Sequence, residues 1–253
     1  MPYANNKGIK IQYQIEGNGT PLIMLHGLLG NSKIYRINGF IDKLKRDYKL
    51  ILIDLRGFGK SDKPHDPAAY SYRTIIDDVI TVLDAAEVDQ AHLYGHSFGG
   101  WFTYGLAYYY PNRIKSLIIS DGVPGRGAAE GLPPLDSYKE SITTHKLFSE
   151  EVKKELLKND LDAFAAISEW WTLEALDIFD FIDGAIEQID LPTLLLISNQ
   201  PEDSDEIRLL KKTAEYIKEA KYTQFKELQH LDLSNKSGIV VPHILDFLAS
   251  VPD

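Results

Sequence analysis

The feature that most constrains the fold is a set of short, continuously apolar runs separated by amphipathic segments. The run at residues 21–25 is Pro-Leu-Ile-Met-Leu, and similar runs occupy residues 49–53 and 191–197. A strand with apolar side chains at every position is buried on both faces, as in a parallel sheet covered by helices. Between the runs, residues 34–46 and 74–86 have helical patterns. The alternation predicts an α/β fold with helices on both faces of a mostly parallel sheet.

The alternation is interrupted between residues 121 and 190. This segment begins with glycine and proline, and most of it has helical patterning, with an amphipathic stretch from Leu173 to Ile189. The strand pattern resumes at residue 191, and a last strand and helix are expected at residues 222–228 and 239–248. We therefore expect an α/β core formed by residues 1–120 and 191–253, with residues 121–190 inserted as a helical cap.

Composition excludes several classes of protein. A chain of 253 residues with a net charge of −10 offers no cationic surface for nucleic acid. The absence of cysteine excludes thiolate nucleophiles, thiolate metal ligands and disulfides. No apolar run reaches the roughly 18 residues of a membrane helix, and the N-terminal segment lacks the apolar core of a signal peptide. We therefore expect a cytoplasmic protein that binds neither nucleic acid nor a membrane.

The sequence Gly95-His96-Ser97-Phe98-Gly99-Gly100 lies between a short apolar strand, residues 91–94, and an aromatic-rich helix, residues 101–110. A serine on a sharp turn from strand to helix is held in a strained conformation with its Oγ exposed above the sheet. The flanking glycines let the two backbones approach closely. This context predicts that Ser97 is a nucleophile.

A serine nucleophile needs a general base, because its hydroxyl is barely nucleophilic at neutral pH. Sites in open α/β sheets form at the carboxyl ends of the strands. Of the seven histidines, His230 alone lies between the last strand and the last helix, while His96 is expected to point away from the site. We therefore predict that His230 is the base.

Four segments in order resemble the α/β-hydrolase superfamily, and the resemblance extends over nearly the whole chain. Leu25-His26-Gly27-Leu28-Leu29-Gly30 is similar to the family's oxyanion loop, and residues 54–62 are similar to its turn after a strand. The nucleophile turn and the helical insertion follow. The resemblance implies an eight-stranded type of sheet, a triad in the order serine, acid, histidine, and no cofactor.

The resemblance also assigns the oxyanion hole to the backbone N–H groups of Leu28 and Phe98. Under the same assignment His26 is structural and braces the loop by hydrogen bonds. Side-chain identity matters little at a backbone donor, so a substitution of Leu28 is expected to reshape the pocket without removing the hole.

The acid of the triad is less well defined by the sequence. The family places it a few residues after the strand at 193–197, where the usual position is Pro201. A shift of one or two residues makes Asp203 or Glu202 the acid, and we favour Asp203. Asp121 is a further candidate, because some family members carry the acid after the preceding strand. Any of these carboxylates could orient the imidazole.

These features predict a serine hydrolase that cleaves small carboxylic esters or lactones through an acyl-enzyme. The cap residues Trp170 and Trp171 are expected to line the substrate pocket, with cap–core packing as the alternative, and Trp101 is expected to be buried beneath the nucleophile turn. No spacing of ligands suggests a metal site. A carbon–carbon bond or thioester hydrolase of the same fold, and a slow-turnover ligand receptor that retains the triad, are the alternatives. The sequence predicts no oligomeric state.

Overall fold

The computed structural model describes residues 2–122, 137–201, 204–217 and 220–252, without the side chains of residues 173–180, 182–183, 205–206 and 209–210. Eight strands of this part of the chain form one sheet in the order β1-β2-β4-β3-β5-β6-β7-β8. The strands are β1 (Tyr3–Asn6), β2 (Ile9–Glu16), β3 (Thr20–Leu25), β4 (Tyr48–Ile53), β5 (Ala91–His96), β6 (Ile114–Ser120), β7 (Thr193–Ile197) and β8 (Ala220–Gln224). Strand β2 is antiparallel to β1 and β4, and the other neighbours are parallel. The predicted mostly parallel sheet is confirmed.

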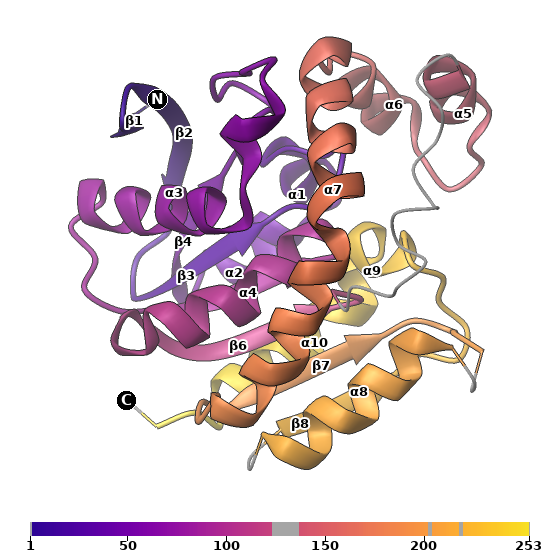
Figure 1. Ribbon diagram of the computed structural model, residues 1–253. Helices are drawn as coiled ribbons and strands as arrows, with labels where there is room; N and C mark the ends of the chain where they lie inside the picture. The colour runs from indigo at the N-terminus through magenta and orange to yellow at the C-terminus, as the bar shows by residue number, and fades with distance from the viewer. Residues whose placement is uncertain (1, 123–136, 202–203, 218–219, 253) are drawn as a thin grey trace.

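Helices cover the sheet on both sides (Figure 1). Those outside the insertion are α1 (Lys33–Ile37), α2 (Phe40–Leu44), α3 (Tyr72–Ala85), α4 (Phe98–Tyr109), α8 (Asp205–Tyr216), α9 (Asp232–Asn235) and α10 (Ser237–Leu248). The described α-helices between β6 and β7, within the segment expected as an insertion, are α5 (Tyr138–Thr144), α6 (Glu150–Leu156) and α7 (Leu161–Ala185). Short 3₁₀ helices are η1 (Pro67–Tyr70), η2 (Pro111–Arg113) and η4 (Ile186–Gln188).

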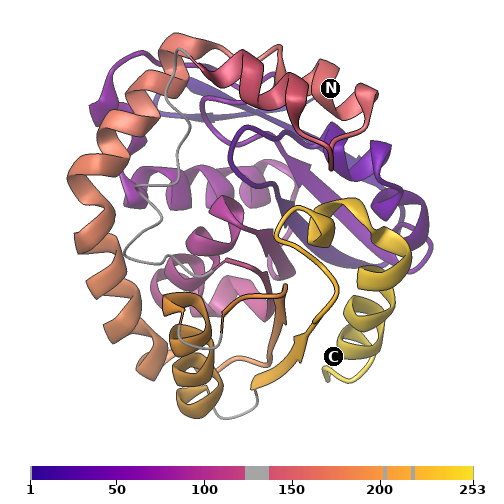
Figure 2. The same cartoon turned by 90° about the vertical axis from the view of Figure 1, so that its right-hand side faces the viewer.

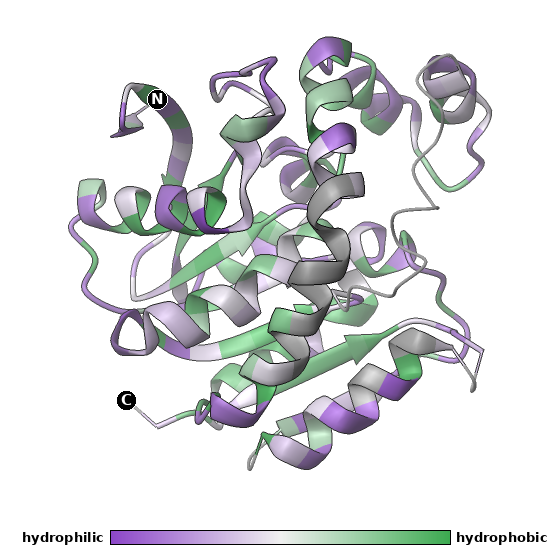
Figure 3. Cartoon of the chain, in the orientation of Figure 1, coloured by the Kyte–Doolittle hydropathy of each residue, from purple (hydrophilic) through white to green (hydrophobic). Residues whose placement is uncertain are grey.

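The apolar residues of each central strand point alternately into two cores. In β3, Leu22 and Met24 join a cluster with α2 and α10, whereas Ile23 and Leu25 join a cluster with α3 and α4. This is the period-two alternation of a strand buried on both faces. Figure 2 shows α10 and α7 on opposite sides of the sheet, and Figure 3 shows the apolar strands between them.

The largest differences from the predicted elements concern two helices and two strands. The helix expected at residues 34–46 is two short helices, because Gly39 between them adopts a left-handed conformation with φ of +74°. Strand β1 was not predicted, and it pairs with β2 at the edge of the sheet. The helix expected from residue 173 begins at Leu161 and runs for 25 residues. The last strand ends at Gln224 instead of residue 228, because the chain turns there and the Leu228 N–H bonds to the Phe225 carbonyl.

The inserted helices pack against the core near the carboxyl ends of the strands. Helix α7 contacts η1 and α4, and α6 contacts α1. Figure 1 shows α7 crossing in front of the sheet, with α5 and α6 at its upper end. Within the described ranges, no helix is both long enough and apolar enough to cross a membrane.

Candidate active site

The nucleophile turn joins β5 to α4. Ser97 has φ of +52° and ψ of −120°, a conformation in which a residue with a side chain is strained. A Cβ atom added at Gly95 would lie 2.6 Å from the Gly99 carbonyl oxygen, and one at Gly99 would lie 2.5 Å from the Leu25 carbonyl oxygen. The two glycines are therefore required for β5, α4 and the end of β3 to meet.

His230 follows β8 and lies beside this turn. Its Nε2 atom is 2.8 Å from Ser97 Oγ, and its Nδ1 atom is 3.2 Å from Asp121 Oδ2. A carboxylate only accepts hydrogen bonds, so an Nδ1–H that donates to Asp121 leaves Nε2 free to accept the serine proton. The structure thus brings together Ser97 and His230, as the sequence predicts, with Asp121 as the neighbouring acid.

Asp121 is positioned by two neighbouring strands, β6 and β7. It follows β6 directly, its own N–H bonds to the Leu196 carbonyl, and its Oδ1 accepts the Ser198 N–H at 2.9 Å. Its side chain is 5% exposed, and its φ of +44° turns the chain sharply after the strand. The other two acid candidates, Glu202 and the favoured Asp203, lie outside the described residues. Among the described residues, Asp121 is the candidate that lies against His230.

His96, which the sequence predicts to point away from the site, is one of its neighbours. Its ring lies against the His230 ring with centroids 5.1 Å apart, and its Nδ1 is 3.3 Å from Ser120 Oγ. Burial, together with the neighbouring His230, lowers the pKa of His96 to about 3. His96 is therefore a neutral ring that packs beside His230. Its position immediately before Ser97 is the signal that could have identified it.

The predicted oxyanion loop lies against Ser97. A Cβ atom added at Gly27 would be 3.3 Å from Ser97 Cβ, so the loop approaches the serine closely. Among the described residues, no backbone hydrogen bond uses the N–H of Leu28 or of Phe98. His26 braces the loop: its Nε2 accepts the Leu55 N–H at 3.0 Å, so its Nδ1–H donates to the Gly27 carbonyl at 2.8 Å.

A cavity of about 450 Å³ opens above these groups. Its apolar wall comes from the predicted oxyanion loop and α1 on one side and from α5 and α6 on the other. The apolar residues of this wall include Leu28, Leu29, Ile34, Ile142, Val152 and Leu156. The described residues that line it include no lysine and no arginine. Such a cavity fits a small, uncharged, largely apolar molecule next to Ser97.

The tryptophans differ from expectation. Trp101, expected to be buried beneath the turn, is only half-buried and lines the cavity. Trp170 and Trp171 are each 2% exposed, and neither is among the described residues that line the cavity. Trp171 stacks on Trp101 with ring centroids 3.8 Å apart, so it supports the cavity wall from behind.

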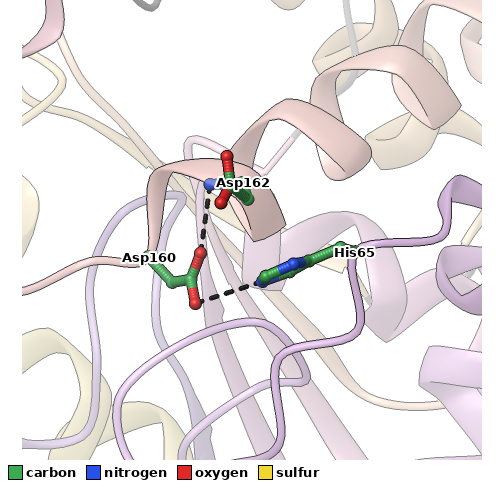
Figure 4. Close-up of side chains that lie close together, drawn as sticks. All are labelled: His65, Asp160 and Asp162. Atoms are coloured by element: carbon green, nitrogen blue, oxygen red, sulfur yellow. Dashed lines mark hydrogen bonds and ion pairs between the residues drawn. The ribbon is translucent and has the colours of Figure 1, made fainter.

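A second group of polar side chains lies away from the cavity, where the loop after β4 meets the start of α7 (Figure 4). His65, Asp160 and Asp162 offer ligand atoms within 4.8 Å of one another. Asp160 is already engaged, because Oδ1 accepts the N–H groups of Asp162 and Ala163 and Oδ2 lies 3.3 Å from His65 Nε2. A helix N-terminus favours anions over cations. We interpret the group as a helix cap tied to the core.

Comparison with known proteins agrees with this architecture. A family model described as the alpha/beta hydrolase fold matches residues 20–138. A 2-hydroxymuconate semialdehyde hydrolase of Pseudomonas sp. strain CF600 is 35% identical over 138 residues, which are 53% of this chain and 48% of that protein. The chain spans about half the length of the curated relatives it matches.

Solved structures match over nearly the whole chain. A meta-cleavage product hydrolase aligns with a TM-score of 0.78 at 20% identity, covering 98% of this chain and 97% of that one. The enol-lactonase from Burkholderia xenovorans LB400 aligns with a TM-score of 0.77 at 18% identity, covering 98% and 100%. At these identities the likeness shows the fold. With the sheet order and the family-model match over residues 20–138, it shows that the chain has the α/β-hydrolase fold.

Proposed function

We propose that this protein is a serine hydrolase that cleaves small carboxylic esters or lactones through an acyl-enzyme. The observation that carries the proposal is the chain of contacts from Ser97 Oγ to His230 Nε2, at 2.8 Å, and from His230 Nδ1 to Asp121, at 3.2 Å. A serine within reach of an imidazole that a buried carboxylate orients is the arrangement that activates a serine hydroxyl.

In the acylation half, Ser97 Oγ attacks the carbonyl carbon while His230 Nε2 takes the hydroxyl proton. The carbonyl π electrons move to oxygen, and the resulting oxyanion accepts hydrogen bonds from the N–H groups of Leu28 and Phe98. One such donor is worth roughly 10²–10³ in kcat. The intermediate then collapses: its bond to the alkoxy oxygen breaks, His230 returns the proton to that oxygen, and the acyl group stays on Ser97.

In the deacylation half, water takes the place of the serine hydroxyl. His230 removes a proton from water as it attacks the acyl carbon, a second oxyanion forms at the same donors, and collapse returns the proton to Ser97 Oγ. The products are the carboxylic acid and the alcohol, or one hydroxy acid from a lactone. Asp121 stabilises the imidazolium present at both intermediates.

The lining of the cavity favours an uncharged substrate. A substrate with a carboxylate would need a cationic partner, and the described lining residues include no lysine or arginine to provide one. Carbon–carbon bond and thioester hydrolysis could use the same serine and histidine. The apolar wall formed with Ile142, Val152 and Leu156 nevertheless supports a neutral ester or lactone with a hydrocarbon acyl group. Because these three residues belong to α5 and α6, we further propose that residues 121–190 act as a cap that completes the pocket.

A fluorophosphonate probe and a p-nitrophenyl ester test the proposal together. The probe should modify Ser97, as identified by mass spectrometry of the peptide, and p-nitrophenyl butyrate should turn over steadily. Ser97→Ala should lose both the label and the turnover. Ser168→Ala, which removes a hydroxyl of α7 away from the cavity lining, should keep both. Labelling that persists in Ser97→Ala would overturn the assignment, and a burst without steady turnover would favour the ligand-receptor alternative.

A further inference from the structure

The oxyanion loop contains a residue held in an unfavourable conformation. The Gly30 N–H bonds to the Gly27 carbonyl at 3.0 Å, which closes a turn over Leu28 and Leu29. Leu29 has φ of +66°. A positive φ at the third position of a turn is typical of type II, in which glycine is the usual residue. A leucine keeps this conformation only when its surroundings impose it.

The surroundings that impose it come from the inserted helices. The Leu29 carbonyl accepts a hydrogen bond from Asn159 Nδ2 at 2.7 Å. The same Nδ2 group donates to Tyr138 Oη at 3.0 Å, and the Tyr138 hydroxyl donates to the Leu156 carbonyl at 2.8 Å. Tyr138 is buried, and the Leu29 side chain packs against the cluster that contains it. The turn is therefore attached to α5 and α6 by both a hydrogen bond and apolar contact.

Asn159 is itself fixed, because it lies between the end of α6 and the capping residue of α7. The next residue, Asp160, caps α7 through the N–H groups of Asp162 and Ala163 and contacts His65 of the core (Figure 4). The Asn159 N–H bonds to the Leu156 carbonyl at 3.2 Å. Because the backbone is fixed on both sides of Asn159, its side chain has little freedom to move and can hold the turn in place.

We propose that Asn159 is a positioning residue, which holds the Gly27–Gly30 turn so that the Leu28 N–H faces the oxyanion. If its hydrogen bond is lost, Leu29 can relax to a negative φ, which rotates the adjoining peptide group and moves the backbone of Leu28. This inference deepens the proposed function and rests on it, since the oxyanion forms only when Ser97 attacks a carbonyl. It makes the oxyanion hole dependent on a residue of the inserted segment that touches no substrate.

Kinetics of Asn159→Ala and Asn159→Asp test the role. Both variants lose the donor, and Asn159→Asp keeps the size of the side chain. A misplaced oxyanion donor should lower kcat for p-nitrophenyl butyrate by roughly ten- to a hundredfold, with KM changed less than about twofold. The matched control is Glu155→Gln, which removes ion pairs with Lys33 and Lys158 beside Asn159 and leaves the turn untouched. Its kcat should equal that of the wild type, and its melting temperature provides the reference for the Asn159 variants.

Two further measurements separate positioning from a purely structural role. An alkyl trifluoromethyl ketone adds to Ser97 and forms an oxyanion, whereas the matching trifluoromethyl carbinol cannot. Asn159→Ala should weaken the ketone at least about tenfold and leave the carbinol unchanged. Adding Leu29→Gly to Asn159→Ala should recover part of the lost kcat, because glycine adopts the positive φ without support.

The outcomes distinguish this inference from the proposed function. If the wild type neither hydrolyses esters nor binds the ketone covalently, the proposed function fails, and the positioning role fails with it. If the wild type does both, and Asn159→Ala and Asn159→Asp match Glu155→Gln in kcat and in the ketone-to-carbinol ratio, only the positioning role is overturned. A loss confined to KM or to melting temperature would overturn it in the same way.

Discussion

Asp121 Oδ2 lies 3.2 Å from His230 Nδ1 although the two residues follow strands that are not neighbours in the sheet. Asp121 follows β6, His230 follows β8, and β7 lies between them. The carboxylate reaches across the end of β7, where the Ser198 N–H donates to its second oxygen. One acid thus contacts the histidine and fixes itself to the intervening strand.

Replacement of this acid by its amide should be severe for catalysis and mild for the fold. The amide side chain of Asp121→Asn would keep an oxygen for the Ser198 N–H, and asparagine, like aspartate, tolerates the positive φ. Its NH₂ group would present a donor to His230 Nδ1 and favour the wrong tautomer, so the substitution should lower kcat by roughly 10³–10⁴. Steady-state kinetics with an activated ester measure the loss, and circular dichroism checks the fold.

The other two candidate acids provide the comparison for this result. If Asp121 is the acid, Asp203→Asn and Glu202→Gln should each stay within about threefold of the wild type in kcat/KM. A large loss in Asp203→Asn with little effect in Asp121→Asn would return the acid to the position that the sequence favours.

The nucleophile turn should be stabilised by removing the strained side chain. Ser97 has φ of +52° and ψ of −120°, where glycine alone is unstrained. The free energy of unfolding of Ser97→Gly should therefore be about 1 kcal/mol higher than that of Ser97→Ala. This difference already includes the larger conformational entropy that glycine loses on folding. Both variants lack the nucleophile, so chemical denaturation compares stability alone. Equal midpoints would mean that the turn stores no strain.

The buried His96 should make stability depend on pH. Its pKa is lowered from 6.5 to about 3 in the folded state by burial and by His230. Below pH 6.5 the unfolded chain therefore binds a proton at this residue that the folded chain does not. Stability should fall as pH is lowered from 6.5 towards 5, with about 1.4 kcal/mol per pH unit for each such proton.

Substitution of His96 isolates this contribution. Urea denaturation between pH 5 and 8 gives the slope of the unfolding free energy against pH. His96→Gln should reduce this slope by up to about 1.4 kcal/mol per pH unit, the value for one proton. The slope is compared instead of the absolute stability because the variant also loses packing against His230. An unchanged slope would mean that His96 is not the residue that takes up the proton on unfolding. His26, whose pKa is also lowered by burial, would then be the next residue to test.

The stacked pair of tryptophans should divide into one residue that affects specificity and one that affects stability. Trp101 lines the cavity and Trp171 lies behind it. Trp101→Ala should enlarge the cavity and raise kcat/KM for bulky acyl esters relative to acetate esters. Trp171→Ala should lower the free energy of unfolding by about 3–5 kcal/mol, the usual cost of truncating a buried aromatic residue. The reverse pattern would support the predicted pocket role of Trp171.

The sequence was sufficient for features that depend on local pattern. Continuous apolar runs predicted the buried strands, because burial on both faces leaves no polar positions to alternate. Ser97 and His230 were predicted from their places at strand ends, where topology brings distant residues to one edge, and the structure places them 2.8 Å apart. Each of these inferences needs only the position of a residue within its own segment.

The features that the sequence could not resolve depend on how segments pack. Asp121 contacts His230 because it reaches past β7, and no local pattern shows that reach. His96 was expected to point away, yet the turn at Ser97 brings its ring to His230. Which tryptophan lines the cavity depends on where α7 meets α4, which the periodicity of neither helix specifies.

The position of Asp121 directly after β6 restricts which residue can follow it at position 122. The chain must leave the strand through a gap beside α4, where a Cβ atom added at Gly122 would lie 2.6 Å from the Gly100 Cα atom. A side chain at position 122 would therefore force the backbone of Asp121 and Gly122, or that of α4 at Gly100, to shift. In a saturation library selected for activity, position 122 should therefore tolerate substitution as poorly as position 97, although Gly122 takes no part in the chemistry.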